Sequence, residues 1–154
     1  DGFAYAGEAL TGKYIGAKDR RSLVKAVKYL FGWTALLVVI STVAYWVGGE
    51  WMVTLMTNQQ SVIEASAPYM IWLVLMPLFS CAAFMWDGIY IGATASAAIR
   101  DCMAWSCVAF YIVYFSMKGF AGIQALYCAY FAHIIVRAVY MTIFAKKEVF
   151  AKVF

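Results

Sequence analysis

Between Ala65 and Ile99 the chain contains a single charged residue, Asp87. A neutral run of this length, rich in Met, Leu, Ile, Phe and Trp, exceeds the roughly 20 residues that a helix needs to cross a bilayer. A carboxylate inside such a helix costs roughly 2.5 kcal/mol or more to insert, so its presence indicates a function. We therefore predict a membrane protein in which Asp87 has a functional role.

The composition supports a membrane protein rather than a soluble domain. Hydrophobic residues make up 66% of the chain and charged residues 13%, whereas soluble domains carry about 25% charged residues. The net charge of +4 comes from clusters of Lys and Arg that flank apolar blocks. That placement disfavours nucleic acid as a partner and predicts a lipid bilayer instead.

The apolar blocks predict an all-α, polytopic helical bundle. We expect a truncated first helix at residues 1–17 and an external connection at 50–66. Four full membrane spans are expected at 29–49, 68–96, 102–117 and 121–145. The spans should be separated by breaks at Gly48-Gly49, Arg100-Asp101 and Lys118-Gly119. Since the chain begins at Asp1 with no polar flank before its first helix, we expect it to be a piece of a longer polypeptide.

The basic residues predict the orientation of these spans. If the loop around Arg20 is cytoplasmic, strict alternation of the spans leaves Lys118 as the one basic residue in the outer connections. Cytoplasmic loops carry the excess of Lys and Arg. The pattern therefore predicts a cytoplasmic C-terminus.

Asp87 is the first candidate for chemistry. On a helix it shares a face with Tyr90, and Ser80 and Thr94 lie two turns away. The oxygens of Tyr90 and Thr94 could join the carboxylate in binding a cation or a proton, because intramembrane carboxylates usually mark ion pathways. The alternative is a structural role, in which Asp87 pairs with a residue of another helix such as Arg137.

Two acidic residues in the first segment are further candidates. Asp1 and Glu8 are seven residues apart and so share a helical face, which allows both to line one cavity. Glu8 lies among small residues and is the better candidate for a cavity residue. The alternative is that Glu8 forms an ion pair with Lys13. His133 and Arg137 also share a face, which allows a proton relay because His titrates near neutral pH. We interpret them instead as packing and snorkelling residues and leave them out of the site.

No motif for enzymatic chemistry is present. The chain has no G-x-S-x-G or H-E-x-x-H motif and a single His, so we predict that it is not an enzyme. The four cysteines show no C-x-x-C spacing, so neither a metal site nor a cofactor is expected. Gly88 and Gly92 have G-x-x-x-G spacing, which predicts the close approach of another helix.

Three segments carry a resemblance to a known family. These are "DGFAYAGEALTGKYIGAKD" at 1–19, "LMTNQQSVIEASAPYMIWLVLMP" at 55–77 and "WDGIYIGAT" at 86–94. In these segments, and in the order of its helices, the chain resembles the multidrug and toxic compound extrusion (MATE) transporters, especially the DinF-like branch. The resemblance implies a fold of twelve helices in two lobes around a central cavity.

On this resemblance residues 1–17 correspond to most of helix eight and the four spans to helices nine to twelve, a C-terminal lobe fragment that should be inactive without the N-terminal lobe. The implied function is efflux of cationic or amphipathic xenobiotics in exchange for protons or sodium, in the inner (plasma) membrane. Asp87 matches an acidic position of helix ten that some members use for cation coupling. Those members carry a tyrosine four residues earlier, where this chain has Ala83.

Two other functions remain as alternatives. The first is a lipid-linked oligosaccharide flippase of the same superfamily, although such flippases usually line their cavity with several basic residues and here only Arg137 lies within a span. The second is a small membrane scaffold without transport activity, or an enzyme subunit, which would leave Asp87 unexplained.

Overall fold

The computed structural model describes residues 2–153, apart from the side chain of Glu50. No strand occurs in this part of the chain, which confirms the all-α fold class. The helices, in chain order, are α1 (Gly2–Gly16), α2 (Arg20–Met56), α3 (Gln60–Ser66), the 3₁₀ helix η1 (Ala67–Tyr69), α4 (Met70–Gly92), α5 (Ser96–Ala121), α6 (Ile123–Glu148) and the 3₁₀ helix η2 (Phe150–Val153).

Within the described residues, four helical stretches are long and apolar enough to cross a membrane. They are Arg20–Gly49, Gln60–Gly92, Ser96–Ala121 and Ile123–Val153. By contrast, the 15 residues of α1 extend over about 22 Å, which is shorter than the roughly 30 Å of a hydrocarbon core. The fold is thus that of a polytopic membrane bundle.

The breaks between helices differ from those expected. Gly48-Gly49 lies inside α2, and both Arg100-Asp101 and Lys118-Gly119 lie inside α5. Arg100 and Asp101 neutralise each other through a 2.8 Å ion pair on the helix surface, so a polar pair does not end this helix. The α5–α6 turn falls instead at Gly122, whose φ of 53° is a conformation that glycine adopts without strain.

The predicted external connection at 50–66 is largely helical. Its first part is the end of α2, the chain is irregular at residues 57–59, and α3 follows. Thr57 ends α2, because its backbone N–H donates to Val53 while its extended backbone turns away. The Thr57 hydroxyl then accepts a hydrogen bond from the backbone of Gln59 at 3.2 Å.

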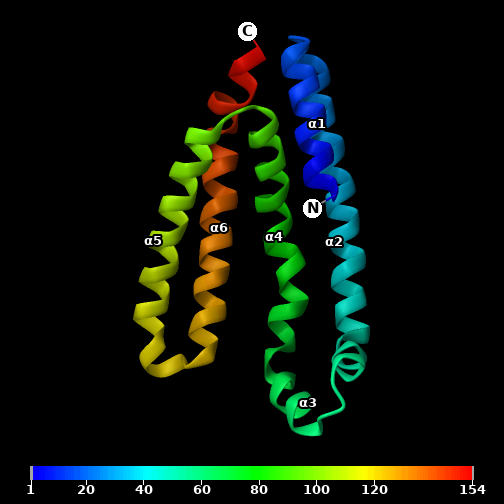
Figure 1. The fold of residues 1–154 in the computed structure, drawn as a ribbon, viewed down its shortest axis with the longest axis vertical. Coiled ribbons are helices and arrows are strands. Elements are labelled where there is room, and N and C mark those ends of the chain that lie inside the picture. The colour runs from blue at the N-terminus through cyan, green and yellow to red at the C-terminus, as the bar shows by residue number, and fades with distance from the viewer. Residues whose placement is uncertain (1, 154) are drawn as a thin grey trace.

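Helix α4 is the centre of the bundle (Figure 1). It contacts α1 and α2 on one side and α6 on the other, while α5 packs mainly against α6. The α1–α2 turn, the α4–α5 turn and η2 lie together at one end of the molecule (Figure 1). We call this the basic end, because the first turn of α2, the first turns of α5 and the end of α6 bring Lys and Arg residues to it.

The α1–α2 turn is fixed by a helix cap. Asp19 precedes α2, and its carboxylate accepts a 3.0 Å hydrogen bond from the backbone N–H of Ser22. This bond satisfies one of the backbone donors that a helix start leaves free. Because the hydrogen bonds from Ser22 favour the charged form, they lower the pKa of Asp19 below its usual range.

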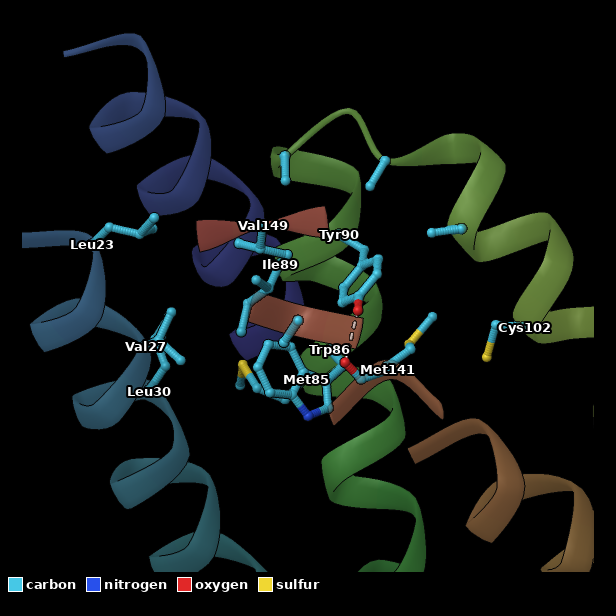
Figure 2. Packing of buried hydrophobic residues seen from close by; sticks show 14 of the residues in the cluster. Leu23, Val27, Leu30, Met85, Trp86, Ile89, Tyr90, Cys102, Met141 and Val149 are labelled. Atoms are coloured by element: carbon cyan, nitrogen blue, oxygen red, sulfur yellow. Dashed lines mark hydrogen bonds between the residues drawn. The ribbon is translucent and has the colours of Figure 1, made fainter. Parts of the chain in front are cut away.

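The main core lies toward the basic end, where α1, α2, α4, α6 and η2 meet (Figure 2). Its members include Leu23, Val27, Leu30, Met85, Trp86, Ile89, Tyr90, Cys102, Met141 and Val149. Large apolar side chains of α2 remain exposed beyond this core, among them Trp33, Val39 and Val47. An apolar face of this kind is what contact with lipid or with further helices requires.

Candidate functional site

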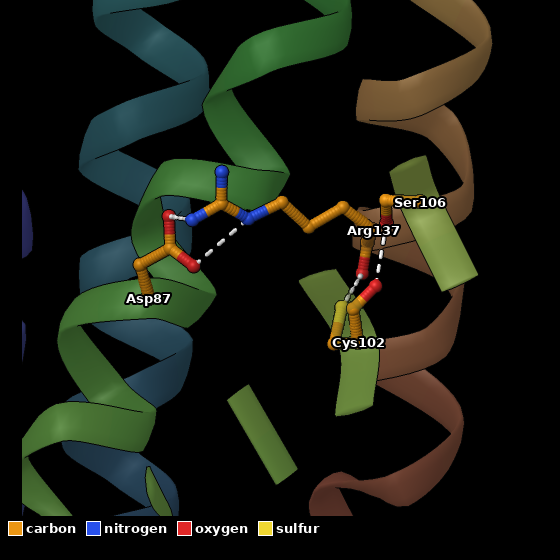
Figure 3. Close-up of polar contacts among 4 residues, drawn as sticks. All are labelled: Asp87, Cys102, Ser106 and Arg137. Atoms are coloured by element: carbon orange, nitrogen blue, oxygen red, sulfur yellow. Dashed lines mark hydrogen bonds and ion pairs between the residues drawn. The ribbon is translucent and has the colours of Figure 1, made fainter. Parts of the chain in front are cut away.

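Asp87 lies on α4 and pairs with Arg137 of α6 (Figure 3). Arg137 Nε donates to Asp87 Oδ1 at 3.1 Å, and Nη2 donates to Oδ2 at 2.5 Å. The side chain of Arg137 is only 14% exposed and that of Asp87 only 16% exposed. Such a two-pronged contact is the geometry that the planar guanidinium favours with a carboxylate.

The backbone beside Arg137 is tied to α5. Its carbonyl oxygen accepts a contact from Cys102 Sγ at 3.6 Å, and Ser106 Oγ donates to the carbonyl of Cys102 at 2.8 Å (Figure 3). Cys102 and Ser106 are both fully buried. Arg137 therefore joins α6 to α4 through its side chain and contacts α5 through its backbone carbonyl.

On another side, Asp87 opens onto a groove between α4 and α1. The groove has a volume of about 170 Å³, and its lining includes Asp87 and Glu8. The remaining lining residues are Ala4, Tyr5, Phe84, Gly88 and Ile91. Glu8 is partly buried, so the structure places both predicted carboxylates on one small cavity.

Two glycines of α4 let α1 come close enough to form this groove. A Cβ built on Gly88 would collide with the backbone of Ala4, and one on Gly92 with the backbone of Glu8. On the α1 side, Gly12 faces the carbonyl of Gly92, 3.5 Å from where its own Cβ would lie. This contact confirms the close helix approach predicted from the G-x-x-x-G spacing.

Tyr90 and Thr94 lie away from the groove. Tyr90 is fully buried, and its hydroxyl donates to the backbone carbonyl of Met141 at 2.7 Å. It therefore faces α6 and fixes packing. Thr94 is exposed in the turn after α4, with a φ of 51° and its hydroxyl donating to Ala93 at 2.7 Å.

The helical repeat places Tyr90 and Thr94 near Asp87 only if the helix continues past Thr94 and if Tyr90 faces the groove. Tyr90 lies within α4 but turns toward α6. Since α4 ends at Gly92, Thr94 no longer follows the helical repeat. The structure thus brings together Asp87 and Glu8 and leaves Tyr90 and Thr94 apart from them. Asp1, the other acidic residue considered for the cavity, lies outside the described residues.

Arg137 is the residue that sequence reasoning left out of the site. From the sequence it can be a structural partner of Asp87, a member of a proton relay with His133 or a snorkelling side chain, and the structure shows the pairing with Asp87. The signal available in the sequence was charge: two opposite charges in separate apolar spans are more stable together than apart. His133 lies one turn before Arg137 on α6 and is partly buried.

A second cavity lies between α4, α5 and α6, on the side of the ion pair away from the basic end. It holds about 380 Å³ and is lined by Tyr69, Trp72, Leu73, Met76, Phe110, Leu126, Tyr127, Tyr130 and Phe131. Trp72 stacks on Tyr127 with ring centroids 5.5 Å apart, and its indole N–H donates to Gln124 at 3.2 Å. The cavity is thus walled mainly by aromatic rings.

Nothing in the described residues forms a metal centre, since no group of three or more His, Cys, Asp or Glu side chains comes together there. The acidic groove and the aromatic cavity are two places where these helices could hold a small molecule or an ion. One offers negative charge and the other offers apolar, polarisable walls.

The chain is similar to known proteins over most of its length. The MatE family model matches residues 2–117. The DNA damage-inducible protein F of Escherichia coli (strain K12) is 30% identical over 129 residues, which is 84% of this chain and 28% of that protein. The chain thus spans less than a third of the curated relative that it matches. No solved structure gives a significant match.

Proposed function

The chain belongs to the MatE family of membrane transporters, and from this premise we propose that it is part of a secondary active antiporter. In this proposal the complete protein exports cationic or amphipathic xenobiotics, by alternating access, in exchange for protons or sodium ions. The chain carries no enzymatic step. Asp87 and Glu8 supply the negative charge that attracts the exchanged cations.

The observation that carries this proposal is the position of Asp87. Its carboxylate is partly buried between α1, α4 and α6 and opens onto a groove that it shares with Glu8. A carboxylate is costly to keep inside a membrane, so its retention beside a cavity supports a role in moving cations. Two carboxylates on one cavity also favour a cation over a neutral or anionic ligand.

The aromatic cavity supports the amphipathic part of the substrate class. Rings such as Trp72 and Tyr127 offer flat apolar contact area and can attract a positive charge over their faces. A cavity of about 380 Å³ is within the usual size of small-molecule sites. We therefore expect loose selection by shape and charge rather than by specific hydrogen bonds.

The rest of the polypeptide is part of the proposal. Because the matched relative is more than three times as long as the matched region, we propose that an N-terminal lobe of the same polypeptide packs against this one and completes the cavity. The partners are then the lipid bilayer and the transported small molecules. We place the protein in the inner (plasma) membrane, with the basic end and the C-terminus on the cytoplasmic side.

The flippase alternative receives less support from the site. A lipid-linked pyrophosphate needs several uncompensated positive charges in the cavity. Arg137, which lies beside Asp87, is neutralised by it. The net charge that this lobe presents at the groove is accordingly negative, through Glu8.

The test is substitution of Asp87→Asn in the natural protein that contains this chain. We expect loss of cation-driven drug efflux from loaded cells or proteoliposomes, with the protein still present in the membrane. Asp101→Asn is the matched control, because Asp101 is also a carboxylate paired with an arginine but lies on the surface with 49% of its side chain exposed. Wild-type efflux in Asp87→Asn would remove Asp87 from the coupling site.

A further inference from the structure

We propose that Arg137 is an internal cation that competes with the transported coupling cation for the carboxylate of Asp87. The inference rests on the proposed function and adds a residue that regulates the same site. In the observed state both carboxylate oxygens of Asp87 accept a hydrogen bond from the guanidinium. A proton or sodium ion that binds the same carboxylate therefore competes with the guanidinium for its negative charge.

The geometry separates the two competitors in space. Arg137 reaches Asp87 from α6, whereas the groove that holds Glu8 approaches it from α1. A cation entering the groove meets Glu8 and one flank of Asp87 while the guanidinium holds the other flank. The carboxylate can thus pass from one cation to the other without being left bare in the membrane, where an uncompensated charge is strongly unfavourable.

Arg137 is also connected in a way that would transmit this exchange. Its own backbone carbonyl is in contact with Cys102 of α5, and α5 packs along α6. Helices α5 and α6 form a hairpin, and the two hydrogen bonds of the Arg137 guanidinium (the fork) join α4 to this hairpin through side-chain atoms alone. Release of the fork would therefore remove one polar link between α4 and α6, while the hydrogen bonds of Trp86 to Thr142 and of Tyr90 to Met141 remain. The glycine contact between α1 and α4 would also stay in place.

The charged and titratable groups around Asp87 come from several helices. They are Glu8 and Tyr5 from α1, His133 and Arg137 from α6, and Cys102 from α5 beside Arg137. Helix α2 contributes an apolar contact near Asp87, in which the ring centroids of Phe31 and Trp86 are 5.2 Å apart. Arg137 is the group among these that places a permanent positive charge on the carboxylate.

The test measures cation binding separately from transport. The natural protein that carries this chain is placed in lipid nanodiscs and titrated with sodium chloride by calorimetry, with N-methylglucamine chloride holding the ionic strength constant. Proton exchange is followed in parallel in weakly buffered solution. The variants are Arg137→Gln, Arg137→Lys and the matched control Arg100→Gln, whose side chain is 75% exposed in a surface pair.

We expect Arg137→Gln to bind the coupling cation, whichever of the two the wild type uses, at least about tenfold more tightly, because the competing charge is gone. Arg137→Lys keeps the charge without the fork and should give a smaller increase of several-fold. Arg100→Gln should bind as the wild type does. In efflux assays, Arg137→Gln should bind cation but transport poorly, since the cation is no longer displaced.

A purely structural ion pair would lower the thermal stability of Arg137→Gln and leave its cation affinity unchanged, and that result would overturn the proposal. If Arg137→Gln is not recovered folded, an unchanged affinity in Arg137→Lys overturns it equally. Absence of cation binding in both the wild type and the variants also counts against it. Cation-driven efflux by the wild type is measured separately and tests the proposed function. The cation titration tests the role of Arg137, so either result can be negative without the other.

Discussion

The two halves of α4 are built on different principles. In residues 80–92, seven residues are buried, and glycines bring the backbone of α1 into direct contact with the helix. In residues 70–79 only Val74 is buried, and the helix meets α6 through aromatic rings that surround a cavity of about 380 Å³. We refer to these as the closed half and the open half of α4.

The difference shows how one helix can combine a fixed charge site with an adaptable surface. Backbone contact through small residues packs the two helices closely and restricts their relative movement, so it holds Asp87 at a defined position between α1 and α6. Aromatic walls around a cavity tolerate ligands of different shape, because their contact area is large and not directional. The ion pair lies in the closed half, where a costly charge can be held in place.

The strongest test of the closed half is Gly88→Ala. The added Cβ would collide with the backbone of Ala4, which cannot move aside as a flexible side chain can, so we expect more than the roughly 3 kcal/mol at the upper end of usual overpacking costs. Thermal unfolding of the purified protein should show a large loss of stability or no folded protein.

Gly32→Ala is the matched control, because nothing lies within 4 Å of a Cβ at that position of α2. Alanine favours a helix interior over glycine by about 1 kcal/mol, so this variant should be as stable as the wild type or more so. Equal behaviour of the two variants would contradict the backbone contact between α1 and α4.

The next largest effect should come from breaking the ion pair. Asp87→Asn leaves the Arg137 charge without its partner, and the loss of one member of a buried pair typically costs about 3–5 kcal/mol. The double variant Asp87→Asn with Arg137→Gln should recover part of that stability in thermal unfolding. The exposed pair of Arg100 and Asp101 should matter by less than about 1 kcal/mol, so equal losses at the two pairs would refute the contrast in burial.

A smaller effect in the closed half is expected for Tyr90→Phe. This change removes the hydroxyl that donates to the Met141 carbonyl. Met141 lies inside α6, so its carbonyl keeps its helical hydrogen bond, and the loss of one further hydrogen bond costs about 0.5–1.5 kcal/mol. Unfolding temperature is the measurement. Tyr111→Phe serves for comparison, since Tyr111 is 57% exposed on α5 and should tolerate the change.

In the open half, Trp72→Phe should change stability little. The variant loses the hydrogen bond to Gln124 and part of the stacking on Tyr127, and an aromatic pair contributes about 0.5–1.5 kcal/mol. We expect instead a change in which amphipathic compounds are exported, measured as resistance across a panel of cationic drugs. A stability loss as large as that of Tyr90→Phe would mean that the open half is packed as tightly as the closed one.

The smallest effect should be at the Asp19 cap, which lies outside both halves of α4. Its pKa is lowered in the folded state by the hydrogen bonds from Ser22. The cap therefore stabilises α2 above the usual carboxyl range, and this contribution is lost as the pH falls through the lowered pKa. Asp19→Asn should remove that acid-range dependence without changing unfolding near neutral pH, as followed by circular dichroism.

Much of the fold could be predicted from the residues in their order. The apolar runs around Trp33 and Trp72 and the clusters of Lys and Arg indicated a membrane bundle of four spans, and the Gly88–Gly92 spacing indicated close helix packing. Helix ends were harder, because polar pairs such as Arg100-Asp101 can remain inside a helix when they neutralise each other. The end of α5 depends on one glycine, Gly122, and its backbone angle.

The candidate site could be predicted only in part. Asp87 and Glu8 were identified because a carboxylate in an apolar segment is exceptional at any depth. Which oxygens and charges surround Asp87 could not be read in the same way, since Tyr90 turned toward Met141 and α4 ended before Thr94. Those outcomes depend on neighbouring helices that lie about 50 residues away in the chain.

The sequence by itself determined that this protein is helical, that it lies in a membrane and that Asp87 carries an unusual charge, because these follow from hydrophobicity and periodicity along one segment. Only the tertiary structure decided which charged side chain pairs with Asp87 and which cavity Asp87 faces. A carboxylate in a low-dielectric interior is stabilised by whatever packing brings within a few ångströms. That distance is set by how α1, α4 and α6 pack together, and no single segment contains it.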